Sequence, residues 1–249
     1  MISCPFFNLN LLLPLGGVLS LAAMTSASGP PSYEVRRTSA KLPVDGSLLD
    51  EGWGQAPLLP PLKLPWDKEE PQSTEARFLW DPNYLYAAFR VWDKEIVIWT
   101  DPKHEGKLAV VDHDRVEMFF ALSEDLREYY CLEINPKGLV LDYKAHHYRN
   151  FDYAWSLEGL RVATSIQENG YTVELAIPLR EMRKLGFPLS TSKSGFSWRV
   201  GVYRADFSLV KPGQLKMLWQ TWVDPQVAQP DFHVPSSFGI FEFVNKDHH

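Results

Sequence analysis

The chain has 249 residues, of which 45% are hydrophobic and 13% aromatic, so it can build a substantial core and does not have the composition of a disordered protein. Its formal net charge is −6 at pH 7, and its basic residues are scattered along the sequence. Because a protein that follows a phosphate backbone needs a basic face, this composition argues against a nucleic-acid partner.

The start of the chain is typical of a secretory signal peptide. No charged residue precedes Glu34, residues 6–23 are mostly apolar, and small residues follow them. We therefore assign residues 1–28 to a signal peptide and expect a secreted, periplasmic or cell-envelope protein of a bacterium. The apolar stretch is shorter than the ~20 residues of a membrane span, and we expect no span in the mature chain. Cys131 would then be the only cysteine, and we expect it to be buried and unreactive.

Alternation of apolar and polar residues predicts ten strands after the signal peptide. They are predicted at 33–37, 75–81, 84–92, 114–122, 128–134, 139–145, 160–166, 171–177, 196–205 and 238–244. One helical turn is expected near Trp53, a short helix is expected at 178–185, and a long loop at 206–237. Many short strands with turn signals between them predict an all-β fold, an antiparallel β-sandwich of the jelly-roll or immunoglobulin-like kind with one short helix. This single domain would span residues 33–244, and the tail 245–249 would be frayed.

Five separated phrases carry a resemblance to a known family. They are VDGSLLDEGW at 44–53, TEARFLWDPNYLYAAFRVWD at 74–93, DRVEMFF at 114–120, GYTVELAIP at 170–178 and SFGIFEF at 237–243. In this order and spacing they resemble the family-nine carbohydrate-binding modules, whose relatives include the DOMON-type sandwich domains. The resemblance implies a non-catalytic protein that binds a mono- or polysaccharide by aromatic stacking and polar contacts.

The resemblance also indicates an aromatic ligand contact. Trp222, followed by Asp224-Pro225, matches a W-x-D-P phrase in which the family carries one of two sugar-clamping tryptophans. We therefore predict that Trp222 is the main ligand contact, exposed in a loop. The alternative is that Trp222 caps the open end of the core.

The second clamping tryptophan of the family has no counterpart at the matching position. Val110, Val111 and Asp112 stand there instead. The resemblance therefore implies that the clamp is either lost or rebuilt from another aromatic residue, with Trp99 and Tyr148 as candidates.

Three charged residues complete the predicted site. Glu117 matches a family carboxylate that accepts hydrogen bonds from sugar hydroxyls, and it alternates away from the apolar Val116 and Met118. The alternative is a solvated charge on the outer face of the sheet. Arg204 and Asp206 end an otherwise apolar strand, and they are either a salt bridge at the rim or a pair that binds hydroxyls.

A metal site is suggested by alternate aspartates. Asp112 and Asp114 flank His113 just before a strand, and carboxylate oxygens are calcium ligands. Members of the family hold structural calcium, so the resemblance adds to this expectation. The sequence lacks the glycine and the further oxygen ligands of an EF-hand loop.

Two other functions remain open. A glycoside hydrolase, or an accessory subunit in polysaccharide degradation, would need two facing carboxylates, which Glu117, Glu133 or Glu174 could supply, but no catalytic phrase accompanies them.

A haem-binding electron carrier is the other alternative, because DOMON-type relatives hold haem b. Met118, Met182 and Met217 are available as axial ligands, although the alternation around Met118 places it in the core.

Overall fold

The computed structural model describes residues 29–98, 103–190, 192, 195–211 and 214–245. The expected signal peptide at 1–28, Trp99 and residues 246–249 of the expected tail lie outside this description. Among the described residues, no helix has the length and apolar character that a membrane crossing requires.

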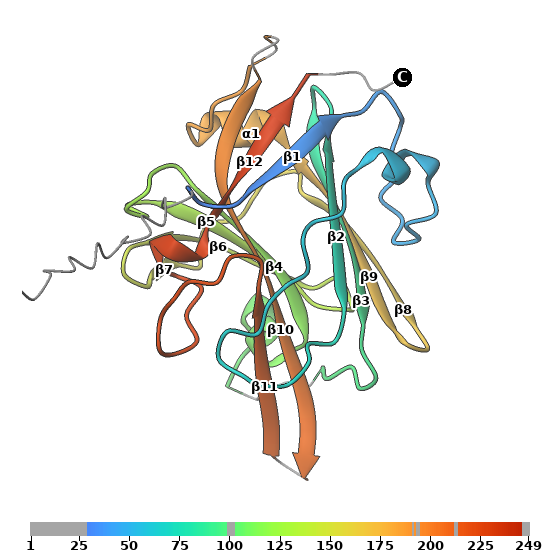
Figure 1. The fold of residues 1–249 in the computed structure, drawn as a ribbon, viewed down its shortest axis with the longest axis vertical. Coiled ribbons are helices and arrows are strands. Elements are labelled where there is room, and N and C mark those ends of the chain that lie inside the picture. The colour runs from blue at the N-terminus through green and yellow to red at the C-terminus, as the bar shows by residue number, and fades with distance from the viewer. Residues whose placement is uncertain (1–28, 99–102, 191, 193–194, 212–213, 246–249) are drawn as a thin grey trace, which may run out of the picture.

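Twelve strands form one sheet that curls on itself (Figure 1). The strands are β1 (Ser32–Arg37), β2 (Thr74–Trp80), β3 (Tyr84–Trp92), β4 (Arg115–Ala121), β5 (Tyr129–Ile134), β6 (Val140–His146), β7 (Asn150–Asp152), β8 (Arg161–Gln167), β9 (Gly170–Pro178), β10 (Phe196–Lys211), β11 (Gln214–Thr221) and β12 (Gly239–Val244). The helical segments are α1 (Leu179–Lys184) and the 3₁₀ turns η1 (Glu51–Gln55), η2 (Gly106–Asp112) and η3 (Pro235–Ser237).

The strand order divides the sheet into two halves. The first half runs β7-β6-β5-β4-β10-β12, with β11 paired to β10, and the second half runs β1-β2-β3-β9-β8. The halves join where β1 lies beside β12, and β1 is the exception to the antiparallel pattern because it runs parallel to both β12 and β2. The predicted β-sandwich is confirmed.

The main hydrophobic core lies between the two halves. Residues at alternate positions of β4 and β9 belong to it, among them Met118 and Leu175. The ring of Phe78 on β2 lies 4.7 Å from that of Phe241 on β12, so the halves contact each other directly. Strict alternation thus sends every second residue of these strands inward and leaves the intervening ones for the outer faces.

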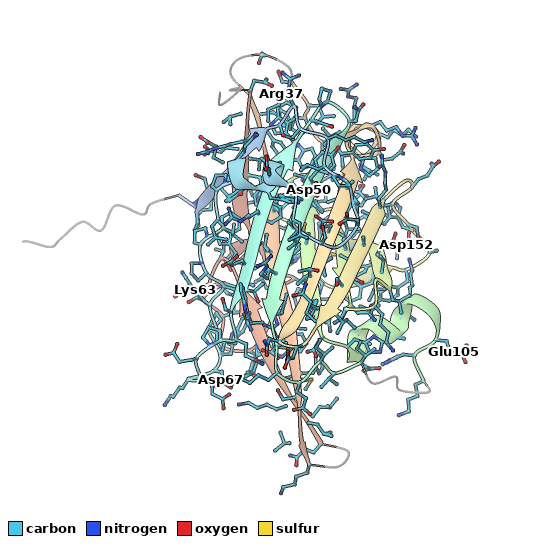
Figure 2. The ribbon with its side chains drawn as sticks, turned by 90° about the vertical axis from the view of Figure 1, so that its right-hand side faces the viewer. Arg37, Asp50, Lys63, Asp67, Glu105 and Asp152 are labelled. Atoms are coloured by element: carbon cyan, nitrogen blue, oxygen red, sulfur yellow. The ribbon has the colours of Figure 1, made fainter. Side chains whose placement is uncertain are left out.

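The outer face of the second half is covered by the chain that precedes β2. Glu174 on β9 accepts hydrogen bonds from the backbone of Asp45 (2.9 Å) and Gly46 (2.7 Å) and from Trp53 Nε1 (3.0 Å). Figure 2 shows Asp50, just before η1, in front of this half of the sheet. Trp53 is buried in a small hydrophobic cluster on this face.

One prediction about the strands is wrong. The segment after residue 205 was expected to be a loop, but β10 continues to Lys211 and pairs with β11 from Tyr203↔Thr221 to Lys211↔Gln214. Figure 1 shows this hairpin projecting below the rest of the molecule. As a result, Trp219 is a strand residue and Trp222 follows directly after the strand.

Candidate functional site

The site is built on the outer face of the first half, where β4 presents its polar residues. Val116, Met118 and Phe120 point into the core, so Arg115 and Glu117 point outward. Further along β4, other parts of the chain cover the outer face, as the complete burial of the outward-pointing Phe119 shows. In register with this row, Glu117 pairs with Glu133 on β5 and with Tyr203 on β10.

A loop between β11 and β12 covers part of this face. Phe232 stacks on Tyr203, with ring centroids 4.2 Å apart and an interplanar angle of 10°. His233 packs on Phe119 at 5.0 Å, and the Tyr203 hydroxyl lies 2.8 Å from Ser237 Oγ. These contacts fix the loop as one wall over the sheet.

Between this loop and the sheet lies a depression of about 140 Å³. Its lining combines charged, aromatic and loop residues: Arg115, Glu117, Glu133, Arg149, Trp219, Pro230, Asp231, Phe232 and His233. Sites for drug-sized ligands measure about 300–1,000 Å³, so this one has room for a single small ring.

The floor of the depression is a buried charge triad. Arg115 Nε lies 2.8 Å from Glu117 Oε1 and 2.6 Å from Glu133 Oε2. The Tyr143 hydroxyl donates a hydrogen bond to Glu133 Oε1 (2.8 Å), which holds the second carboxylate in place. Arg115 Nη1 in turn donates to the carbonyls of Val111 and His113.

The triad retains hydrogen-bonding capacity. Arg115 Nε, Glu117 Oε1 and Glu133 Oε2 are at ion-pair distance, but none has a well-aligned hydrogen bond to a described residue. Burial, and then the nearby Glu133 carboxylate, raise the pKa of Glu117 to about 8. The protonated form of Glu117 is therefore more favoured than that of an exposed glutamate, and in this form the side chain can donate as well as accept.

The rim of the depression carries an aromatic ring and a second arginine. The Trp219 ring is half-buried, and its centroid lies 5.6 Å from the Arg115 guanidinium carbon. Arg149 Nη1 donates to Asp231 Oδ1 (3.0 Å), and the Tyr148 hydroxyl donates to the other oxygen of the same carboxylate. Tyr148, which we considered as a replacement clamp, thus lies at the rim and is exposed.

His233 contributes a neutral surface to the wall. Burial, and then the nearby Arg149 guanidinium, lower its pKa to about 3. The Tyr129 hydroxyl lies 3.0 Å from His233 Nδ1. The ring therefore stays uncharged and packs as an aromatic group.

Trp222 lies in the main core rather than in this depression. It is only 3% exposed, and its ring lies 5.8 Å from that of Phe241. The ring also passes so close to Gly239 that a Cβ there would be 2.4 Å from it. The expected surface exposure of Trp222 is wrong, and its position matches the alternative of a core cap.

The side chains of Arg204 and Asp206, on β10, point to the inner face of the sheet, whereas that of Glu117, on β4, points to the outer face. Glu117 pairs with Tyr203, so the even-numbered residues of β10 point inward. Both side chains are fully buried, and Arg204 Nη2 contacts Asp93 Oδ2 (2.9 Å) and Asp206 Oδ2 (3.3 Å). The predicted rim position of this pair is therefore wrong, and the structure does not bring it together with Glu117.

The predicted metal pair is also separated. Asp112 Oδ2 lies 2.5 Å from His104 Nδ1, whereas Asp114 points inward. Among the described residues, Asp114 groups with Asp93 and Asp206, one carboxylate oxygen of each lying within 4.8 Å of the other two. A second acidic group, Asp45, Asp50 and Glu174, belongs to the covering segment over β9.

Of the lining residues, only Glu117 was predicted as a ligand contact. Glu133 was considered only as a catalytic carboxylate, and Arg115, Arg149, Trp219 and residues 230–233 were missed. The sequence could have indicated two of these residues as members of the site. Arg115 shares the face of Glu117 by alternation, and Glu133 occupies the outward position of a strand whose Leu132 and Ile134 point inward. Arg149 and Trp219 depend on β7 and β11, which we did not predict.

Comparison with known proteins gives a family match. A family model described as carbohydrate family 9 binding domain-like matches residues 44–246. Among curated proteins, none matches the sequence significantly.

Solved structures share the fold. A candidate carbohydrate-binding protein from Bacteroides uniformis has a TM-score of 0.68 and 15% identity, covering 86% of this chain and 99% of its own. A carbohydrate-binding module of family 9 from Caldicellulosiruptor kristjanssonii, solved with cellotriose, has a TM-score of 0.59 and 15% identity, covering 87% and 95%. The module from the same organism solved with glucose has a TM-score of 0.56 and 15% identity, covering 88% and 98%.

Proposed function

Because the chain belongs to the carbohydrate family 9 binding domain-like family, we propose that it binds a saccharide, without acting on it, in the depression beside Trp219. A sugar ring has an apolar face of C–H groups and a fringe of hydroxyls. It is bound by an aromatic face for the first and by charged or amide groups for the second.

The observation that carries this proposal is the position of the Trp219 ring beside the charge triad of Arg115, Glu117 and Glu133. The three charged groups line the same depression as the ring, so an apolar sugar face and its hydroxyls would find partners together. A hydrogen bond to a charged group contributes about 1.5–3 kcal/mol, so a hydroxyl that bonds one of these groups would gain affinity from it. Glu117 is also the residue that matches the family's hydroxyl-binding carboxylate.

The size of the depression favours a ligand of which one sugar ring is bound. The small volume of the depression, about 140 Å³, suits a single pyranose or the terminal unit of a chain. Relatives of this fold have been solved with glucose and with cellotriose. We therefore include both in the first panel of ligands.

Calorimetric titration of the purified protein with neutral mono- and oligosaccharides tests the proposal. Removing an aromatic anchor costs on the order of 2 kcal/mol, so Trp219→Ala should weaken binding roughly thirty-fold. Trp92→Ala is the matched control, because Trp92 is exposed on the outer face of the other half. If no saccharide of the panel binds, or if both variants lose affinity equally, the proposal fails.

Hydrolysis is tested on the same glycans by the release of reducing sugar. Glu117 and Glu133 meet at one guanidinium atom, an arrangement that favours mutual neutralisation over a cleft between two carboxylates. We expect no release above the background of a heat-denatured sample.

We also propose that the protein acts outside the cytoplasm. Support comes from the charge-free start and the apolar run at 6–23. N-terminal sequencing of the protein from the envelope or medium of its host should give a start near residues 24–29. Recovery of the intact chain from the cytosol would refute the proposal.

A further inference from the structure

A buried cage of oxygen atoms lies at the base of the projecting hairpin, separate from the depression. Asp93 follows β3, Asp114 precedes β4 and Asp206 lies on β10, so the cage joins three parts of the chain. All three side chains are at most 2% exposed. Burying three carboxylates away from solvent destabilises the folded state unless a positive charge lies among them.

The positive charge is the guanidinium of Arg204. Its Nη1 donates to three oxygens, the carbonyls of Gln72 (3.3 Å) and Trp92 (3.2 Å) and the hydroxyl of Thr74 (3.2 Å). Its Nη2 contacts carboxylate oxygens of Asp93 (2.9 Å) and Asp206 (3.3 Å). The guanidinium is thus surrounded by five oxygens.

This set of oxygens has the composition of a calcium site. Calcium in proteins takes six to eight oxygens from carboxylates, backbone carbonyls and neutral side chains, and the guanidinium is surrounded by all three kinds. The resemblance to family-nine modules implies a structural calcium ion. The residues of this cage do not fit such an ion, because the guanidinium of Arg204 already fills the space among the oxygens.

We infer that the Arg204 guanidinium takes the place of a divalent cation. Its ion pairs with Asp93 and Asp206 hold the segment between β3 and β4 against β10. The function assigned to this group is structural, and it is independent of the proposed saccharide site. The chain would consequently keep its stability when divalent cations are removed.

The remaining negative charge of the cage is stabilised by local donors. Asp114 accepts hydrogen bonds from the backbone N–H groups of Val97 (2.5 Å) and Phe207 (2.6 Å), and Asp206 Oδ2 accepts one from Gln220 Nε2 (3.3 Å). These donors and the guanidinium together contact carboxylate oxygens of all three aspartates.

Some oxygens of the cage are not used by the guanidinium. Asp206 Oδ1, Gln220 Oε1 and the Tyr171 hydroxyl are buried and have no hydrogen-bond partner among the described residues. When the guanidinium is cut away, these atoms and the carboxylates form an empty oxygen-lined cavity. Such a cavity should bind the ion that Arg204 replaces.

The experiment compares thermal unfolding of the unsubstituted protein and of Arg204→Ala in EDTA and in millimolar CaCl₂. The unsubstituted protein should melt at the same temperature in both. Arg204→Ala leaves buried carboxylates unpaired, so in EDTA its Tm should fall by roughly 10 °C, and CaCl₂ should restore several degrees. Binding of Tb³⁺, read by luminescence sensitised through nearby aromatic rings such as Tyr171, should appear only in the variant.

Two further variants complete the design. Arg204→Lys keeps the positive charge, so it should fold, melt lower than the unsubstituted protein and show no calcium response. Arg127→Ala is the matched control, since Arg127 is largely exposed and its ion pair, within the part of the chain that the structure describes, is with the exposed Asp125. If EDTA lowers the Tm of the unsubstituted protein and CaCl₂ restores it, a bound metal ion stabilises the protein and the inference is wrong. It is equally wrong if Arg204→Ala, folded with CaCl₂ or without it, gains neither Tm nor Tb³⁺ binding.

Discussion

Replacing Trp222 by alanine separates a core residue from a ligand contact. The indole is 3% exposed and packs against Phe241 and over Gly239. Truncating a buried tryptophan costs about 3–5 kcal/mol through lost burial and the cavity that remains. For a chain of this length, 1 kcal/mol shifts the Tm by roughly 2–4 °C, so we expect a fall of about 10 °C.

The assay pairs a thermal melt with a binding titration well below the melting transition. Trp222→Ala should bind the saccharide with nearly the affinity of the unsubstituted protein, because the ring does not line the depression. Trp92→Ala, at an exposed position, should melt within about 2 °C of the unsubstituted protein. Loss of binding with an unchanged Tm in Trp222→Ala would refute our account of the core and restore the expectation from the W-x-D-P phrase.

Three further predictions concern stability. Glu117→Gln should remove a pH dependence of stability. Because the folded pKa of about 8 exceeds the ordinary value, the folded state keeps a proton that the unfolded chain loses, and the free energy of unfolding falls between about pH 4.5 and 8 by up to about 1.4 kcal/mol per pH unit. Urea unfolding of both proteins at several pH values checks the difference, and parallel curves would contradict it. Glu174→Ala should cost about 2–3 kcal/mol in the same assay, because it removes the acceptor of hydrogen bonds from two backbone N–H groups and Trp53, whereas Trp53→Phe, which removes one of them, should cost less. Gly170→Ala should unfold at a much lower temperature, because a Cβ at φ +144° would lie 1.9 Å from the carbonyl oxygen of Val91, and a melt near the original temperature would contradict this geometry.

Alternation in the sequence was sufficient to predict most of the strands. The inward set of β4 separates Glu117 from Met118, and this placed Glu117 on the outer face before the structure did. The hairpin of β10 and β11 was missed because Leu218 interrupts the alternation of Leu215, Met217 and Trp219. The Pro212-Gly213 dipeptide is a turn signal between two such segments, and it could have indicated the hairpin.

The site itself could be predicted only in part. The same alternation that sends Val200 and Val202 inward also sends Arg204 inward, but a buried charge is unfavourable without a partner. Its partner Asp93 is more than a hundred residues away, so local sequence reasoning placed Arg204 at the rim instead. The family phrase led to Trp222, whereas the ring beside the depression belongs to Trp219, three residues earlier.

The central claim is tested most directly by following the indole N–H signals of the tryptophans by NMR during titration with glucose and with cellotriose. The account predicts that the Trp219 signal shifts in a saturable way with at least one of these ligands or another neutral saccharide of the panel. The signals of Trp92 and Trp222 should stay in place. Shifts confined to Trp92 or Trp222, or no shift with any saccharide, would contradict binding in the depression.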